Sequence, residues 1–97
     1  MERAAVVEKL SANRDQLRSN GVEALCLFGS TARDDAGPES DVDLFFDNND
    51  PKFSLVELVR IKNMIEEALG SSADIMTRDS IHPRLRSRVE ASSLQIF

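Results

Sequence analysis

The spacing of apolar residues predicts a helix followed by a buried strand in the first part of the chain. Residues 2–19 form the helix, whose inward face carries three aliphatic side chains at helical spacing: Val6, Leu10 and Leu17. We expect it to end at Asn20-Gly21, because glycine adopts the left-handed conformation after a helix at little cost. Residues 22–28 are apolar except for Glu23, which predicts a strand with both faces covered.

In the middle of the chain, a polar connection over residues 29–40 leads to two further strands with a helix between them. A second strand is predicted over 41–46, followed by a helix over about 52–69 in which Asp50 caps the start and proline takes the first helical position. A third strand is predicted over 73–77. The helix between the second and third strands has the length of a crossover connection.

The last part of the chain predicts one more helix and a short strand. Asp79 or Ser80 caps this helix, and its inward face carries three apolar residues: Ile81, Leu85 and Val89. Residues 94–97 are read as a brief terminal strand. We interpret the arginines of this region as a solvated helix face. A contact to leaving pyrophosphate or to an acidic partner is the alternative. The four residues are Arg78, Arg84, Arg86 and Arg88.

The resulting order, α-β-turn-β-α-β-α, predicts an α/β (α+β) fold with a small mixed sheet. The crossover helix makes the second and third strands parallel neighbours, whereas the short connection makes the first and second strands antiparallel. The end of the first strand then lies beside the starts of the other two. We therefore expect three core strands with helices packed on one side, and a functional edge where these strand ends meet.

Three aspartates fall at that edge. Asp41 and Asp43 lie on one face of the second strand because side chains alternate along a strand, and Asp74 occupies the matching place on the third. Adjacent carboxylates repel one another unless a cation lies between them. Mg²⁺ is bound by one or two carboxylates together with phosphate oxygens. A solvated strand start would be the better explanation of an isolated Asp-x-Asp, but the third carboxylate at Asp74 shifts the balance toward a magnesium-dependent reaction of a phosphate compound.

A small-residue turn precedes these carboxylates. Gly29 and Ser30 follow the buried first strand, and residues 31–33 (Thr-Ala-Arg) can open a short helix whose free backbone N–H groups favour phosphate oxygens. Glycine permits close approach, and the serine hydroxyl can donate a hydrogen bond. A plain turn with the serine as helix cap is the alternative.

Composition and charge narrow the function further. The chain of 97 residues has the size of one domain, spanning 1–97, and its net charge of −5 argues against a protein that grips long nucleic acid. A nucleotide that arrives with metal ions is compatible with this charge. No apolar run reaches the roughly 20 residues of a membrane span. The single cysteine, Cys26, fits a reducing cytoplasm, so we expect a cytoplasmic protein.

The string Gly-Ser-Thr-Ala-Arg at 29–33, followed by Ser-Asp-Val-Asp-Leu at 40–44, resembles the signature of the minimal nucleotidyltransferases of the polymerase-beta superfamily. The family pattern is G-S-x-A-R-G, a short loop, then S-D-x-D-[LI]. One departure is clear, because Asp34 stands where the family usually has glycine. The resemblance covers essentially the whole chain and implies the nucleotidyltransferase fold.

The resemblance also implies roles for the residues of the motif. Gly29, Ser30 and Arg33 would bind the phosphates of ATP. The three aspartates Asp41, Asp43 and Asp74 would ligate two Mg²⁺ ions and carry the catalysis. Asp74 would also be a candidate general base. The implied reaction transfers a nucleoside monophosphate, AMP from ATP, to a hydroxyl group. The implied setting is an antitoxin whose acceptor is a tyrosine of a small helical HEPN-type toxin.

Two other functions remain open at this point. The chain would be a binding module that neutralises or scaffolds a partner if Asp34 impairs the motif loop. It would be a small-molecule nucleotidyltransferase, acting on a compound such as an aminoglycoside, if a partner supplied the substrate domain. The sequence leaves open the base preference, the acceptor and whether the chain forms a homo-oligomer.

Overall fold

The computed structural model describes residues 1–35, 37 and 41–97, so Ser40 of the motif lies outside the described part. In chain order the elements are α1 (Arg3–Ala12), α2 (Arg14–Ser19), β1 (Ala24–Phe28), α3 (Gly29–Ala32), β2 (Val42–Asp47), α4 (Leu55–Leu69), β3 (Ala73–Thr77), the 3₁₀ helix η1 (Arg78–Ser80), α5 (Pro83–Ala91) and β4 (Leu94–Gln95).

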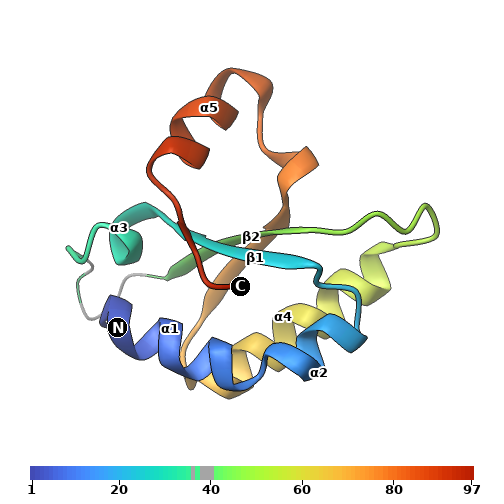
Figure 1. Ribbon diagram of the computed structural model, residues 1–97, viewed down its shortest axis with the longest axis horizontal. Helices are drawn as coiled ribbons and strands as arrows, with labels where there is room; N and C mark the ends of the chain where they lie inside the picture. The colour runs from blue at the N-terminus through green and yellow to red at the C-terminus, as the bar shows by residue number, and fades with distance from the viewer. Residues whose placement is uncertain (36, 38–40) are drawn as a thin grey trace.

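The strands form one mixed sheet in the order β3-β2-β1-β4 (Figure 1). β1 and β2 are antiparallel, and β2 and β3 are parallel, as the connection lengths predict. The predicted terminal strand becomes β4, which pairs antiparallel with β1. The chain continues alongside β1 after it, because the Ile96 N–H donates to the Leu25 carbonyl at 2.8 Å. The mixed α/β fold is thereby confirmed, with a fourth strand added at the β1 edge.

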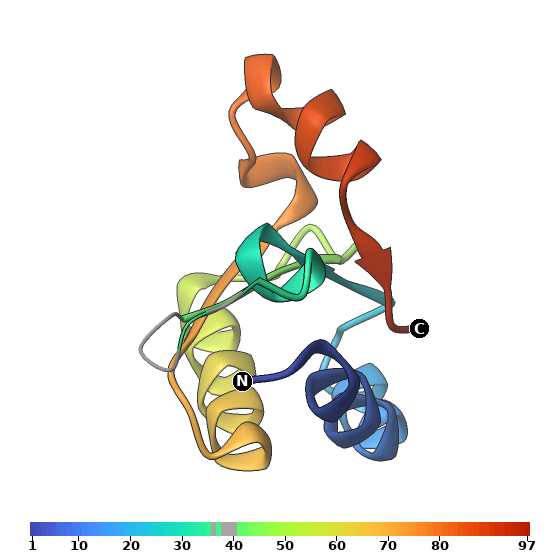
Figure 2. The same ribbon diagram turned by 90° about the vertical axis from the view of Figure 1, so that its left-hand side faces the viewer.

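The helices lie on both faces of the sheet. Figures 1 and 2 show α1, α2 and α4 below it and α5 above it. The larger core lies on the α4 side, where Leu44 and Phe46 of β2 meet Ile61 and Ile65. On the opposite face Cys26, Phe45 and Ile81 form a smaller core. The expectation of helices on one side thus describes the larger layer, and α5 covers part of the second face. No helix in the described ranges is long and apolar enough to cross a membrane.

The first predicted helix is divided in two. It breaks at Asn13, whose side-chain amide donates to the Lys9 carbonyl at 2.8 Å, while its own carbonyl accepts the Leu17 N–H at 3.0 Å and starts α2. An asparagine side chain that bonds to nearby backbone competes with continued helix. Leu10 before the break and Leu17 after it are both buried, so the hydrophobic face was predicted correctly although the continuity of the helix was wrong.

The start of α4 and the cap of α5 also differ from the prediction. Ser54 and Glu57 form a capping box, so α4 begins at Leu55, and Asp50 instead accepts the Lys52 N–H in a turn. In the last helix His82 is the cap, because its Nδ1 accepts the Arg84 N–H and proline follows at the first helical position. Leu85 points outward with 48% of its surface exposed, so its inward placement was wrong.

Candidate functional site at the carboxylate edge of the sheet

The structure brings two of the predicted aspartates side by side. Asp43 of β2 is in direct parallel register with Asp74 of β3, and on its other side it pairs with Phe28, the last residue of β1. Neighbouring strands lie about 4.8 Å apart, so the two carboxylates emerge at adjacent positions on one face. Asp41 lies two residues before Asp43 and is exposed. All three therefore lie at the edge where the strand ends meet, as the topology predicts.

Asp43 is the electrostatic centre of this edge. Partial burial raises the pKa of its carboxyl above the ordinary value of 3.8, and the negative charges of Asp74 and then Asp41 raise the pKa further. The Arg33 guanidinium acts in the opposite direction. A half-buried carboxylate beside two like charges is stabilised by a cation, which is the electrostatic setting of a metal ligand.

These aspartates are the oxygen donors that Mg²⁺ prefers. Within the described ranges no group of three or more His, Cys, Asp and Glu side chains is placed so that it could hold a metal ion. Mg²⁺ does not require such a group, because it is usually held by one or two carboxylates, with waters and substrate phosphates completing the shell. Asp43 together with one neighbouring aspartate offers the one or two carboxylates that such an open site would need.

The predicted phosphate turn lies directly against Asp43. Gly29 begins α3 with φ +73°, a left-handed conformation that L side chains rarely adopt. A Cβ placed on Gly29 would collide with the Asp43 Oδ2 atom and would also lie 3.3 Å from its Cγ. Only glycine lets the turn approach the carboxylate this closely. The structure thus brings together Gly29 and Asp43, which the sequence placed fourteen positions apart.

The rest of the turn is anchored in the protein interior. Thr31 and Ala32 are buried with 1% and 8% of their surfaces exposed, and Ser30 beside them is half-buried. Arg33 is exposed, and its Nε lies 3.3 Å from Asp35 Oδ2. Its side chain therefore pairs within the loop, although its charge still reaches Asp43. Arg33 adjoins the carboxylates without contacting them in the described structure.

Asp34, the departure from the family pattern, occupies the left-handed region with φ 61°. It is the only non-glycine residue with positive φ among those the structure describes. Asparagine and aspartate tolerate this region better than most residues. The loop therefore keeps the backbone conformation that a glycine would take, and the substitution leaves the fold of the turn intact.

Phe45 shares the face of the aspartates but belongs to the core. It is fully buried, with the Phe28 ring 5.8 Å away and the Arg78 guanidinium 4.8 Å from its ring centre. Because it is fully buried in the smaller core, Phe45 cannot flank a nucleotide base in this structure.

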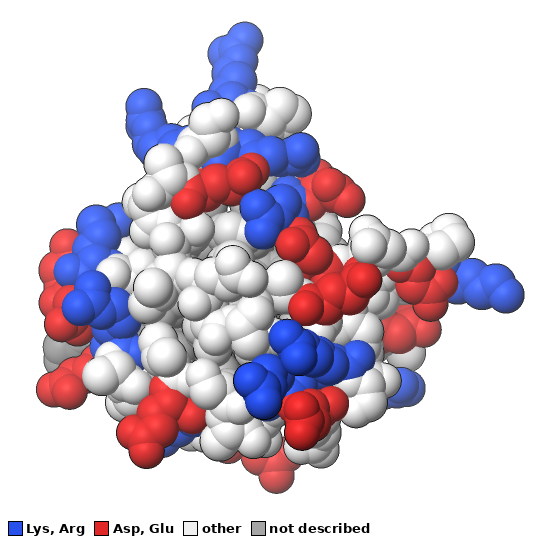
Figure 3. Space-filling model, viewed as in Figure 1, with Lys and Arg blue, Asp and Glu red and all other residues white. Residues whose placement is uncertain are grey.

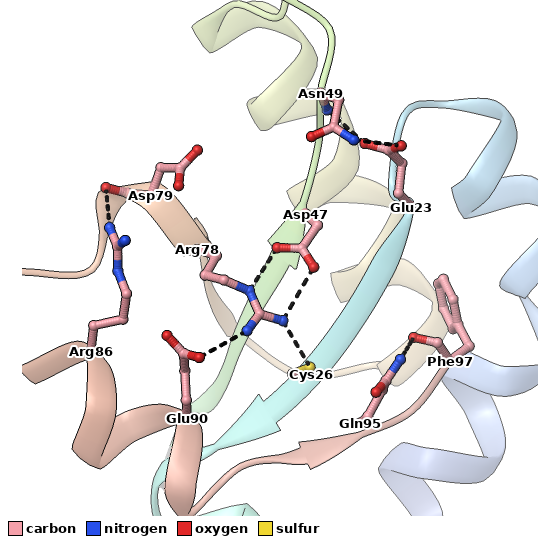
Figure 4. A network of polar contacts seen from close by, with 10 residues as sticks. All are labelled: Glu23, Cys26, Asp47, Asn49, Arg78, Asp79, Arg86, Glu90, Gln95 and Phe97. Carbon is pink, nitrogen blue, oxygen red and sulfur yellow. Dashed lines mark hydrogen bonds and ion pairs between the residues drawn. The ribbon is translucent and has the colours of Figure 1, made fainter.

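An arginine network at the other end of the strands was missed from the sequence (Figure 4). Arg78 donates to both carboxylate oxygens of Asp47, at 2.7 and 3.1 Å, and to Glu90 at 3.1 Å. The solvated-face interpretation is wrong for Arg78, which is only 32% exposed at its side chain. The network ties β2, η1 and α5 together. The one available signal was an arginine just after a strand, which does not identify its partner.

The other arginines of this region remain on the surface. Figure 3 shows Lys and Arg side chains over α5 with Asp and Glu side chains below them, and side chains of both charges elsewhere on this face. Arg84 and Arg88 are exposed, as a solvated helix face requires, and Arg86 is partly buried with one bond to the Asp79 carbonyl at 3.2 Å. Burial of Cys26 agrees with its expected place in the core.

Comparisons with known proteins give a consistent result. The chain matches the nucleotidyltransferase domain family over residues 7–96. A relative from Methanocaldococcus jannaschii, named as a protein adenylyltransferase, is 41% identical over 81 residues, which cover 84% of this chain and 86% of the relative.

Solved structures extend the likeness to three dimensions. A minimal nucleotidyltransferase superimposes with a TM-score of 0.75 and 31% identity, covering 97% of this chain and 95% of its own. A complex of an MNT antitoxin with a tri-AMPylated HEPN toxin of Shewanella oneidensis contains a chain that superimposes with a TM-score of 0.65. That match covers 90% of this chain and 68% of the other at 20% identity, and it shows the fold alone.

Proposed function

The chain belongs to the nucleotidyltransferase domain family, and from this premise we propose that it transfers AMP from ATP to a hydroxyl group of a partner protein. The observation that carries the proposal is the edge where Gly29 lies against Asp43 and Asp43 lies in register with Asp74. This edge combines a close backbone approach for phosphates with carboxylates whose mutual repulsion favours a cation.

Each residue of the edge has a role that follows from its chemistry. Gly29 and Ser30 would bind phosphate oxygens through backbone N–H groups and the serine hydroxyl. Arg33 would contact phosphate or support the loop. The aspartates Asp41, Asp43 and Asp74 would hold Mg²⁺, which when bound stabilises negative charge on the phosphates and orients them.

The transfer needs no reactant other than ATP and the acceptor hydroxyl. The acceptor hydroxyl oxygen forms a bond to the α-phosphorus as the bond from that phosphorus to the pyrophosphate oxygen breaks in line with it. Pyrophosphate is the leaving group. The acceptor proton passes to a carboxylate oxygen of Asp74, which is exposed and can approach an incoming hydroxyl.

The partner follows from the relatives rather than from any residue here. The chain superimposes on part of a complex that contains an AMPylated HEPN toxin. We infer that the acceptor is a tyrosine of a HEPN-type protein encoded nearby, which makes this chain the antitoxin of a pair.

The test is transfer of label from ATP labelled at the α-phosphate to the neighbouring HEPN-type protein in the presence of Mg²⁺. We expect labelled partner with the natural chain and none with Asp41→Asn or Asp43→Asn. Retained transfer in both variants would refute the assigned roles. A stable complex that never acquires label, with ATP and Mg²⁺ present, would establish the alternative of a binding module.

A further inference from the structure

The end of the phosphate turn and the start of the first helix hold one another. Asp34 Oδ1 accepts the backbone N–H of Arg3 at 3.3 Å, and Arg3 Nη1 donates to the Ala32 carbonyl at 3.2 Å. Arg3 is the first residue of α1, and Ala32 is the last residue of α3. Figures 1 and 2 show the N-terminal end of α1 lying below α3. We call Arg3 and Asp34 the clamp.

The clamp adds one capping bond to each of the two helices. Glu2, at the cap position of α1, makes no side-chain capping bond in the described structure, so the Asp34 carboxylate takes over this role from a distant loop. A negative charge also interacts favourably with a helix N-terminus. In return the Arg3 guanidinium donates to the Ala32 carbonyl at the end of α3, one of the carbonyls that a helix leaves unpaired within itself.

The position of Asp34 in the turn makes this arrangement specific. Its N–H donates to the Thr31 carbonyl at 3.1 Å, and the Asp35 N–H donates to the Ser30 carbonyl at 3.0 Å. These two bonds are the Schellman pattern, in which the residue after the cap is left-handed and is usually glycine. The left-handed conformation is less favourable for an aspartate than for a glycine. Only the aspartate, however, provides a carboxylate that can bond to Arg3.

The placement of α3 decides how the site is assembled. A helix of four residues is not stable by itself, so its position depends on what holds it. Burial of Thr31 and Ala32 holds its inner side, and the clamp holds its end. Gly29, at the other end, lies so close to Asp43 that a Cβ added to it would collide with the carboxylate.

We propose that Arg3 and Asp34 are positioning residues, which fix the phosphate turn relative to the Asp43 carboxylate and so set the affinity for ATP. The proposal rests on the proposed function for its nucleotide, but the geometry of the clamp is independent of it. The first helix of the fold thereby becomes part of the nucleotide site without touching substrate.

The decisive variant is Asp34→Gly, which removes the carboxylate and the conformational cost together. We expect a midpoint of thermal unfolding equal to or above that of the natural chain, and yet a three- to tenfold higher KM for ATP with kcat changed by less than twofold. A purely conformational role for this residue predicts an unchanged or lower KM. Asp34→Asn tolerates the left-handed region and keeps an oxygen acceptor, so it should restore most of the affinity.

Arg3→Gln tests the other half of the clamp. We expect a similar rise in KM, and a larger rise when it is combined with Asp34→Gly, because Arg3→Gln removes the bond to the Ala32 carbonyl and Asp34→Gly removes the bond to the Arg3 backbone N–H. Arg14→Gln is the matched control, since Arg14 pairs with Asp15 at 3.7 Å on α2, and it should leave KM unchanged.

Hydrogen exchange separates failure of the clamp from failure of the proposed function. The Arg33 N–H, which bonds to the Gly29 carbonyl at 3.2 Å, should exchange several-fold faster in Arg3→Gln than in the natural chain without any nucleotide. Unchanged exchange in Arg3→Gln would overturn the proposal even if ATP binds normally. Faster exchange in a chain that binds no ATP would keep the clamp as a structural contact and overturn its role in nucleotide affinity.

Discussion

At Gly29 the backbone conformation and the neighbouring carboxylate each exclude a side chain, and a second glycine separates the two effects. Gly29 and Gly70 have nearly the same left-handed φ, +73° and +69°. A Cβ on Gly70 meets nothing within 4 Å in the described structure, whereas one on Gly29 meets Asp43. We expect Gly70→Ala to lower the free energy of unfolding by about 1–2 kcal/mol, the cost of the conformation alone.

Gly29→Ala should cost more than this and should also abolish ATP binding, because Asp43 must move to make room. Chemical denaturation measures the first effect, and calorimetric titration with ATP and Mg²⁺ measures the second. If Gly29→Ala bound ATP as well as Gly70→Ala does, the turn would not depend on its close contact with the carboxylate.

Removing the charge of Asp43 should stabilise the folded protein by an amount that depends on pH. Burial and the charges of Asp74 and Asp41 raise the pKa of this carboxyl in the folded protein. The folded state then holds the proton more tightly than the unfolded state, so ionisation lowers stability as the pH rises through the raised pKa. Below the ordinary pKa of 3.8 the penalty disappears.

Asp43→Asn should therefore unfold at a higher temperature than the natural chain at pH 7 without metal. The difference should shrink as the pH falls toward 3.8, because the natural side chain becomes neutral as well. Thermal unfolding in chelator between pH 4 and 8 measures this. A natural chain that is the more stable of the two at pH 7 would mean that Asp43 has a stabilising cationic partner in the protein itself.

At the scale of elements, the Arg78 network connects α5 to the sheet. Arg78→Met removes the bonds to Asp47 and Glu90 and leaves both carboxylates without their partner. Because these side chains are about a third exposed, we expect a loss of about 1–2 kcal/mol in the free energy of unfolding. Urea denaturation measures it. Cys26, which Arg78 approaches at 4.0 Å, should also react faster with thiol reagents as α5 loosens.

Arg14→Gln again provides the comparison, because the Arg14 side chain is 53% exposed and its partner Asp15 is 95% exposed. An isolated surface pair of this kind contributes less than about 0.5 kcal/mol. Equal losses in the two variants would show that Arg78 contributes no more than a solvated arginine, as its sequence context first indicated.

The predicted elements were most accurate where apolar spacing decides the structure. The third strand was predicted over residues 73–77, its observed bounds, because a short apolar run between glycine and charged residues allows few alternatives. The predictions failed where side-chain hydrogen bonds decide, as at Asn13 and at the Ser54 capping box. The prediction that Leu85 points inward failed for another reason. In the described structure α5 has no buried residue, so it does not bury one full face against the sheet.

The sequence predicts which strands bring the site residues together, but not the side-chain contacts around them. Connection lengths fix which strands are parallel, and this places Asp43 beside Asp74. The left-handed conformation of Asp34 and its bond to Arg3 depend on how a distant helix docks, which no local pattern reports. The Arg78 network was missed for the same reason, because Asp47 and Glu90 are 31 and 12 residues away from it.

For the whole molecule, the net charge of −5 and the acidic edge favour a substrate that brings its own cations. ATP with Mg²⁺ satisfies this condition, whereas a bare polyanion would be repelled by Asp41, Asp43 and Asp74. The protein places these carboxylates on the face of the sheet that α5 only partly covers, so the site stays open to a second protein. Membership of the nucleotidyltransferase family agrees with this arrangement.

Calorimetric titration of ATP into the natural chain and into Asp43→Asn, each with Mg²⁺ and with chelator, measures whether the carboxylate edge holds the nucleotide. We expect binding only by the natural chain with Mg²⁺. Equal binding in chelator, or binding by Asp43→Asn as tight as that of the natural chain, would contradict this expectation, because the nucleotide would then be held without the carboxylate edge.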